Sequence, residues 1–144
     1  MSDSFSAKTL EFSITDFCNL ACPLCAQGTP WQEDKQTMSL AYLRRVSELF
    51  EPHEFAAIKL SGGEPTLHPE FARICSELRQ LFPGRRYELA TNGRLLAKHA
   101  SHLEVFDRIV LTNYPGLNDQ IYEELVALAL PNVLARIRRD YEQM

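Results

Sequence analysis

The sequence lacks any apolar run approaching the ~20 consecutive residues that a membrane-spanning helix needs. It also lacks an excess of basic charge, because 15 Lys and Arg stand against 19 Asp and Glu and give a formal net charge of −4. This balance argues against nucleic acid as a partner, since phosphate binding needs a surplus of Lys and Arg. The opening residues, MSDSFSAKTLEF, lack the basic segment and apolar core of a secretory signal. We therefore expect a soluble, cytoplasmic protein with neither a membrane nor a nucleic-acid partner.

Cysteine is scarce, with four in 144 residues, and the four are unevenly placed. Three of them fall between positions 18 and 25, whereas Cys75 stands alone. A disulfide framework usually spreads an even number of cysteines over a small secreted chain, while a tight cluster in an intracellular chain more often indicates metal or redox chemistry. Cys75 lies on the apolar stripe of a predicted helix, which favours a buried, inert thiol over a fourth ligand.

Short apolar strands alternate with amphipathic helical stretches along the chain. Strands are predicted at 10–14, 57–60, 87–90 and 108–111, and the segment 133–138 is a candidate fifth strand. The helical stretches are 40–50 with Ser39 as N-cap, 69–81 with Pro69 at its first position, 95–103, and 118–128 with Asn118 as cap. This alternation predicts an α/β fold with a parallel sheet, in a single domain over residues 1–144.

Polar loops follow the predicted strands directly: the cysteine loop, then 61–65, 91–93 and 112–116. Right-handed crossovers bring the carboxyl ends of parallel strands to one edge of the sheet. Since α/β folds build their sites at that edge, we expect these four loops to form one site.

The strongest chemical signal is the C-x3-C-x2-C triplet of Cys18, Cys22 and Cys25. Thiolates are soft ligands that select iron–sulfur clusters or zinc. A fully coordinated [4Fe–4S] cluster takes four cysteines, so three would leave one iron open to another ligand. Structural zinc remains a less favoured alternative.

The triplet resembles the cluster motif of the radical S-adenosylmethionine (SAM) superfamily. The segment 61–66, SGGEPT, resembles the GGE segment that this family carries after its second strand, and the two glycines allow close approach of the backbone to a ligand. The segment 91–93, TNG, matches a weaker family feature, and Asn113 ends the fourth strand, where family members often place a polar residue near the ribose.

The resemblance implies that Cys18, Cys22 and Cys25 hold a [4Fe–4S] cluster. The residues that it places near SAM are Gly62, Gly63, Glu64, Pro65, Leu24, Asn92 and Asn113. Leu24 stands where the family often has an aromatic residue beside the adenine. The implied activity is that of a radical SAM enzyme: a one-electron reductant of flavodoxin or ferredoxin type reduces the cluster, and SAM is cleaved to methionine and a 5′-deoxyadenosyl radical that abstracts hydrogen from a substrate. The substrate stays open.

The chain departs from the family in length, because an eight-unit βα barrel typically needs ~250 residues. About four βα units and a fifth strand imply an incomplete, partial TIM-type barrel that stops after strand four or five. The sequence leaves open a truncated chain, a compact natural variant, and a half completed by a partner chain or homo-oligomer. It also leaves open a cluster-binding or electron-transfer module without catalysis.

Several side chains near these motifs are expected to be structural. For Phe17 and Trp31, packing on the edge of the domain is favoured, and shielding of the cluster from water is the alternative. For the basic residues Arg136, Arg138 and Arg139 a solvated face is favoured, and a contact with an anionic substrate or the SAM carboxylate is the alternative.

Overall fold

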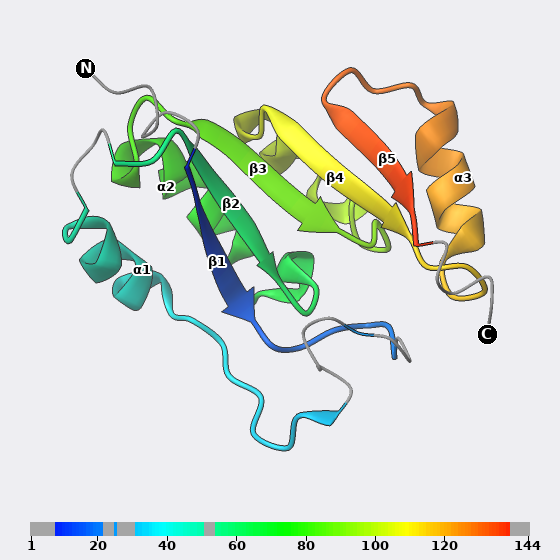
Figure 1. Cartoon of the computed structure of the whole chain (residues 1–144), viewed down its shortest axis with the longest axis horizontal. Coiled ribbons are helices and arrows are strands. Elements are labelled where there is room, and N and C mark those ends of the chain that lie inside the picture. The colour runs from blue at the N-terminus through cyan, green and yellow to red at the C-terminus, as the bar shows by residue number, and fades with distance from the viewer. Residues whose placement is uncertain (1–7, 22–24, 26–30, 51–53, 139–144) are drawn as a thin grey trace.

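The five strands of the computed structural model form one parallel sheet in the order β1-β2-β3-β4-β5 (Figure 1). The structure describes residues 8–21, 25, 31–50 and 54–138. The strands are β1 (Thr9–Thr15), β2 (Ala57–Gly62), β3 (Arg86–Thr91), β4 (Arg108–Asn113) and β5 (Val133–Ile137). Each neighbouring pair is parallel. The α/β prediction is therefore confirmed, and the fifth strand forms.

Helical segments connect successive strands, as βα units require. They are α1 (Leu40–Ser47), η3 (Pro65–Leu67), α2 (Phe71–Leu81), η4 (Ala97–Val105) and α3 (Asp119–Ala127). The carboxyl ends of the strands, from which the chain continues into these segments, all lie along one edge of the sheet (Figure 1). Among the described residues, no helix has the length and apolarity that a membrane crossing needs.

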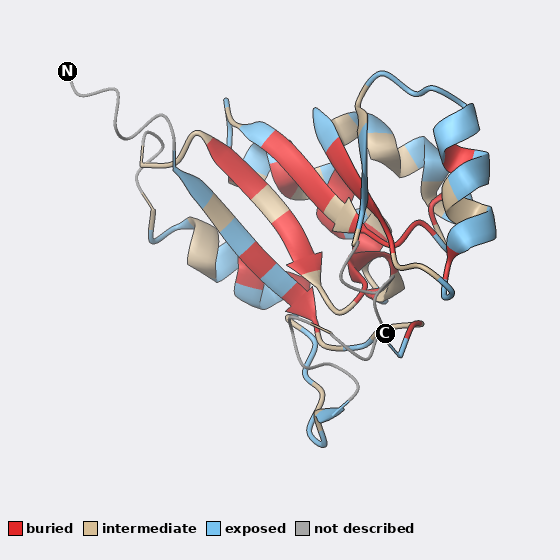
Figure 2. Ribbon diagram, turned by 45° about the vertical axis from the view of Figure 1, so that its right-hand side comes forward, coloured by how far each residue is buried: buried red, intermediate tan, exposed pale blue. Residues whose placement is uncertain are grey.

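The main core lies between one face of the sheet and the helices. Strand residues such as Phe12, Ile14 and Leu60 are buried there against Leu43 of α1 and Leu78 of α2 (Figure 2). Strands buried on both faces of a parallel sheet read as continuous hydrophobic runs. In β1 the exposed residues alternate with the buried ones instead, so its opposite face is polar. That polar face is where a ligand can lie.

The helix starts only partly follow the sequence prediction. Ser39 caps α1 as expected, because its side chain accepts a hydrogen bond from the Tyr42 N–H at 3.0 Å. The prediction of Pro69 at the first position of α2 is wrong, since that helix begins at Phe71. The reason is a turn before it: the ring nitrogen Nδ1 of His68 accepts the Glu70 N–H at 2.9 Å.

Two further helix predictions need correction. The stretch expected at 95–103 is a 3₁₀ segment over Ala97–Val105, and His99 interrupts it with φ −106° and ψ 15°. The last helix was predicted to run to position 128, but it ends at Ala127, and Leu128 lies at the C-cap of α3 and is 62% exposed. Leu125 is the residue of α3 that is buried.

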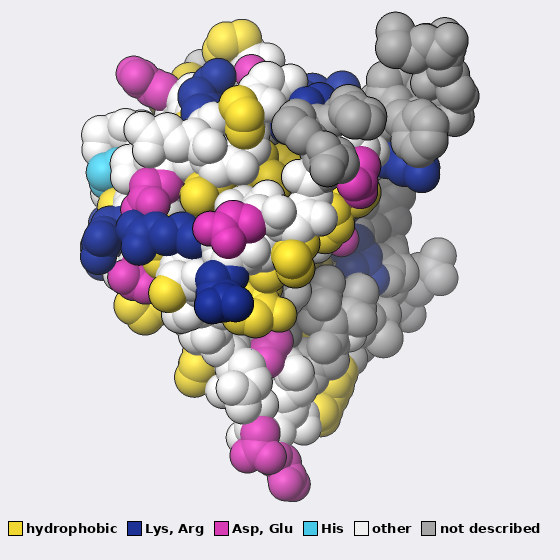
Figure 3. Space-filling view, turned by 90° about the vertical axis from the view of Figure 1, so that its left-hand side faces the viewer, with side chains coloured by type: hydrophobic (Ala, Val, Ile, Leu, Met, Phe, Trp, Pro, Cys, Tyr) yellow, Lys and Arg dark blue, Asp and Glu magenta, His cyan; other side chains and the backbone are white. Residues whose placement is uncertain are grey.

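The outer surface mixes charges of both signs, in keeping with the small net charge. Figure 3 shows acidic and basic side chains interspersed with hydrophobic ones on the side of the molecule that it presents. Arg44 of α1 and Glu77 of α2 form a two-point ion pair at 2.6 and 2.8 Å, which links the two helices across the surface.

Candidate functional site

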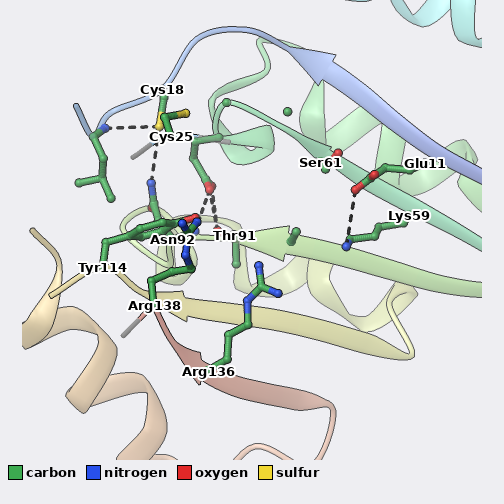
Figure 4. Close-up of a pocket in the computed structure, with 15 residues that line it drawn as sticks. Glu11, Cys18, Cys25, Lys59, Ser61, Thr91, Asn92, Tyr114, Arg136 and Arg138 are labelled. Atoms are coloured by element: carbon green, nitrogen blue, oxygen red, sulfur yellow. Dashed lines mark hydrogen bonds and ion pairs between the residues drawn. The ribbon is translucent and has the colours of Figure 1, made fainter. Parts of the chain in front are cut away.

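A pocket opens at the carboxyl ends of the strands and extends down the polar face of the sheet (Figure 4). Its lining comes from four of the strands, from the loops that follow β1 to β4, and from the residue directly after β5: Glu11, Cys18, Leu20, Cys25, Lys59, Ser61, Gly62, Gly63, Glu64, Ala90, Thr91, Asn92, Tyr114, Arg136 and Arg138. The structure thus brings together the cysteine loop, the GGE segment and the TNG segment, as their positions after successive strands predicted.

Six of the residues assigned to the cluster or to SAM from the sequence line this pocket: Cys18, Cys25, Gly62, Gly63, Glu64 and Asn92. Pro65 is buried in η3, and Asn113 is buried at the end of β4. Cys22 and Leu24 lie outside the described residues. The roles assigned to all of these residues from the resemblance stay predictions.

The cysteine loop starts where β1 ends and carries two described thiols, both partly buried. Leu20 packs against Cys18 and Cys25, with Tyr114 on the same small apolar cluster. The Cys18 sulfur accepts the Leu20 backbone N–H at 3.4 Å. Burial raises the pKa of the Cys18 thiol, and the nearby Glu64 carboxyl adds to the shift, while the Leu20 N–H opposes it. A cation bound at the sulfur would favour the thiolate form.

The two glycines of the GGE segment are required by contact with the cysteine loop. Gly62 has a φ of +138°, and a Cβ atom there would lie 2.3 Å from the Thr15 carbonyl oxygen. A Cβ atom on Gly63 would lie 2.3 Å from the Phe17 carbonyl oxygen. The Gly63 N–H donates to the Thr15 carbonyl oxygen at 2.8 Å, and the Glu64 N–H donates to the Phe17 carbonyl oxygen, also at 2.8 Å. The sequence suggested that these glycines approach a ligand, and the structure adds that they seat the loop that leads to Cys18.

Glu64 has its side chain in a buried junction between the strand ends and is 1% exposed. Its carboxylate accepts hydrogen bonds from the Thr66 hydroxyl at 2.6 Å, the Thr91 hydroxyl at 2.7 Å and the Asn92 N–H at 2.9 Å. Burial raises the pKa of this carboxyl, although the hydrogen bonds oppose the shift. Glu64 therefore ties the GGE segment to the TNG segment.

Asn118 connects the loops that follow β3 and β4, a role that the sequence did not reveal. It was predicted to cap α3, and it does occupy the N-cap position, but its side chain makes no capping hydrogen bond. Its amide nitrogen donates instead to the carbonyl oxygens of Asn92 at 2.8 Å and Thr112 at 2.9 Å. Its amide oxygen accepts from Asn113 Nδ2 at 3.1 Å and from the Tyr114 N–H at 2.7 Å.

The polar face of the sheet below the loops carries a row of alternating charges. Glu11 pairs in register with Lys59, Lys59 with Glu88, and Glu88 with Arg108. The Lys59–Glu11 ion pair spans 3.5 Å and the Arg108–Glu88 pair 3.9 Å. Of these residues, Glu11 and Lys59 line the pocket, and together with Ser61 they form its polar wall.

Two arginines of the C-terminal basic run line the pocket, and Arg136 is also exposed to solvent, as expected for a solvated face. Arg136 donates from Nε to the Thr112 hydroxyl at 2.8 Å. The guanidinium of Arg138 lies 6.0 Å from the centre of the Tyr114 ring. The two-residue period of β5 places positions 136 and 138 on one face, and this was the signal that could have located them. Arg139 lies outside the described residues.

The loop aromatics also differ from the expectation that they pack on the edge of the domain. Phe17 is 49% exposed and Trp31 is 62% exposed. Both lie in the segments between β1 and α1, where the described backbone is irregular.

The donor set of the pocket suits a soft metal centre. Two thiols from one short loop meet there against an apolar side chain, and thiolates favour iron–sulfur clusters or zinc. Within residues 8–21, 25, 31–50 and 54–138, no group of three or more His, Cys, Asp or Glu is arranged to hold a metal ion. The third cysteine of the motif, Cys22, falls outside those ranges.

Comparison with known proteins defines the class. A model of the Radical SAM superfamily matches residues 12–141, which is most of the chain. The chain therefore belongs to the radical SAM superfamily, as the cysteine triplet and the GGE segment predicted. Membership places it in a family of enzymes, for which SAM and an iron–sulfur cluster are typical.

Two relatives show the similarity within this family. The GTP 3′,8-cyclase of Mycobacterium ulcerans is 36% identical over 101 residues, which cover 68% of this chain and 28% of that protein. Molybdenum cofactor biosynthesis protein 1 of Drosophila melanogaster is 29% identical over 102 residues, which cover 68% of this chain and 18% of that protein. The chain thus spans less than a third of the length of either relative.

A solved structure supports the fold. BtrN, crystallised in complex with AdoMet and 2-DOIA, superposes with a TM-score of 0.75 over 93% of this chain and 58% of that one, at 21% identity. At 21% identity this similarity supports the fold of the chain and says nothing about its substrate.

Proposed function

We propose that this chain is the cluster- and SAM-binding part of a radical SAM enzyme, with Cys18, Cys22 and Cys25 as the ligands of a [4Fe–4S] cluster. The observation that carries the proposal is the meeting of Cys18 and Cys25 with Gly62, Gly63 and Asn92 around one pocket. These cysteines would hold a cluster whose chemistry is one-electron reduction of the SAM sulfonium, which would cleave SAM to methionine and a 5′-deoxyadenosyl radical able to abstract hydrogen from a substrate.

The residues of the chain prepare the pocket for these groups. The close approach of Gly63 to the loop holds Cys18 beside the end of β2. Leu20 covers the two described thiols with apolar surface, which limits the access of water and lowers the local dielectric. The polar wall formed by Glu11, Lys59 and Ser61 faces the same pocket and offers contacts to a polar substrate. We propose an electron donor of flavodoxin or ferredoxin type as partner.

A second candidate rests on the edge strand. In β5, Leu134 is 45% exposed and Ile137 is 42% exposed, so the described part of the sheet ends on a partly apolar edge. Such an edge is a site for further strand pairing. A chain that needs a completing partner would bind the cluster and exchange electrons without cleaving SAM efficiently by itself.

Anaerobic reconstitution with iron and sulfide tests the metal. We expect about four iron and four sulfide per chain, as a [4Fe–4S] cluster requires. The variants Cys18→Ala, Cys22→Ala and Cys25→Ala should each lose most of the iron. Cys75→Ala is the matched control and should retain it, because Cys75 lies in the helix-side core. Stoichiometric zinc without iron would contradict the proposal.

Reduction of the reconstituted protein with SAM present separates the two candidates. Formation of 5′-deoxyadenosine supports the enzyme. An intact cluster without this product supports a module that needs a partner for catalysis.

A further inference from the structure

Asn92 directs its side chain toward the cysteine loop from the end of β3 (Figure 4). Its amide nitrogen has two N–H groups and therefore two donations to make. One goes to the side-chain oxygen of Asn19 at 2.8 Å, and the other points to the Cys18 sulfur at 3.9 Å. Asn92 is 4% exposed, so these groups have protein rather than bulk water around them.

The orientation of this amide is fixed by its other partners. The side-chain oxygen of Asn92 accepts the Arg94 backbone N–H at 3.0 Å. In the flipped orientation, the Asn92 amide nitrogen would face the Arg94 N–H, so that two donors would meet. The Asn92 amide oxygen would then face the Asn19 side-chain oxygen, so that two acceptors would meet. The nitrogen must therefore face the sulfur.

The backbone of Asn92 is held from two sides. Its N–H donates to the Glu64 carboxylate at 2.9 Å, and its carbonyl oxygen accepts from Asn118 Nδ2 at 2.8 Å. Buried hydrogen bonds of this kind keep a side chain in one position, which a donor to a cofactor ligand needs.

We propose that Asn92 raises the reduction potential of the cluster through Cys18, by donating an N–H···S hydrogen bond to that sulfur. This inference rests on the proposed function, because it assumes that Cys18 is a cluster ligand. Reduction adds negative charge to the cluster and its sulfurs, so a donor stabilises the reduced form more than the oxidised form. Asn92 thereby raises the potential and makes the cluster easier to reduce.

Only one of the two described thiols receives this donor. The Leu20 N–H also points to Cys18, at 3.4 Å, so that sulfur has two donors. The Leu20 donor belongs to the backbone and survives side-chain substitution. Asn92 is thus the donor to Cys18 that can be removed without changing the cysteine loop itself.

The test is a redox titration of the reconstituted protein without SAM, in which the EPR signal of the reduced cluster is measured at each potential. Asn92→Leu removes both donors at similar volume. We expect a threefold to tenfold lower ratio of reduced to oxidised cluster at a fixed potential, where tenfold corresponds to 59 mV for one electron. The matched control is Asn132→Leu, which removes an amide that donates to Phe106 O at 3.3 Å, away from the pocket. It should leave the ratio unchanged.

Asn92→Asp provides a second variant of nearly the same shape. It exchanges the donor for a negative charge, so the ratio should fall further than in Asn92→Leu. Equal potentials in the wild type and both variants would overturn the inference while leaving the cluster proposal intact. Failure of both variants to hold a cluster would also overturn it, because Asn92 would then be a purely structural residue. A wild type without a cluster would instead remove the proposed function.

Discussion

Gly63 lies so close to Phe17 that a Cβ atom on the glycine would sit 2.3 Å from the carbonyl oxygen of the phenylalanine. The N–H of the next residue, Glu64, donates to that same oxygen at 2.8 Å. The end of β2 and the loop that leads to Cys18 therefore form one backbone contact that only glycine permits. This contact links the GGE segment mechanically to the cysteine triplet.

Gly63→Ala should displace the cysteine loop. The methyl group has to move backbone atoms, since the Phe17 oxygen cannot rotate away, and such overpacking typically costs about 1–3 kcal/mol. We expect a lower free energy of unfolding in urea and a loss of most of the iron after reconstitution.

Gly84→Ala is the control for this substitution. Gly84 has a φ of +71°, so alanine strains the backbone there, but its Cβ would meet no atom within 4 Å. It should lose stability and still bind iron. Equal iron binding in Gly63→Ala and the wild type would show that the contact does not position the loop.

The architecture was predictable because short apolar strands alternate along the chain with helical stretches, and α1 and α2 each carry an apolar stripe. Phe12 and Ile14 alternate with exposed residues in β1. Buried residues recur at helical spacing in the helices, as Leu40 and Leu43 do in α1 and Ile74 and Leu78 do in α2. The loops after the strands then had to meet at one edge. Ends of helices were less predictable, since the turn that His68 forms delays the start of α2.

The contacts within the site were not predictable, because they join residues far apart in the sequence. The sequence did not reveal that the Glu64 carboxylate accepts hydrogen bonds from the Thr91 hydroxyl and the Asn92 N–H, more than 25 positions along the chain. Asn118 has the local pattern of a helix cap, which hides its bridge to the Asn92 carbonyl. A local pattern identifies residue types for a site, but partner selection depends on the assembled sheet.

Glu64 predicts a pH dependence of stability. Burial raises the pKa of its carboxyl above the ordinary value of 4.5 in the folded protein. Between that value and the higher folded pKa, the folded state binds more protons than the unfolded state, so stability falls as pH rises. The contribution is fully present below pH 4.5 and is lost as pH passes the folded pKa.

Glu64→Gln should remove this dependence at nearly constant shape. The Gln side chain still accepts the Asn92 N–H, and its amide can donate to the hydroxyls of Thr66 and Thr91. Urea unfolding of the metal-free protein at several pH values above 4.5 gives the difference between wild type and variant, in which the other titrating groups largely cancel. The stability of the wild type relative to the variant should fall by up to about 1.4 kcal/mol per pH unit. A constant or rising difference would contradict the raised pKa.

Asn118→Ala should destabilise the junction between the loops after β3 and β4. The substitution leaves the buried carbonyl oxygens of Asn92 and Thr112 without their donor, and each unsatisfied buried group typically costs about 1–3 kcal/mol. We expect a thermal midpoint several degrees lower. Gln120→Ala is the control, because its side chain pairs only with exposed Glu124 along α3, and it should change the midpoint little. Similar midpoints for the two variants would mean that the Asn118 bridge adds no stability.

Cys75 should be chemically inert in the folded protein. Its side chain is 4% exposed, and burial raises the pKa of the thiol to about 12, so the reactive thiolate is rare near neutral pH. We expect iodoacetamide at pH 8 to modify Cys18 and Cys25 in the metal-free, folded protein while leaving Cys75 intact, because the first two thiols are only partly buried. Peptide mass spectrometry reads each site separately. In urea Cys75 should react at the same rate as the other thiols, which serves as the internal control. Rapid modification of Cys75 without denaturant would mean that the core between α2 and the sheet opens readily, and would contradict the assignment of this cysteine to the packing of the fold.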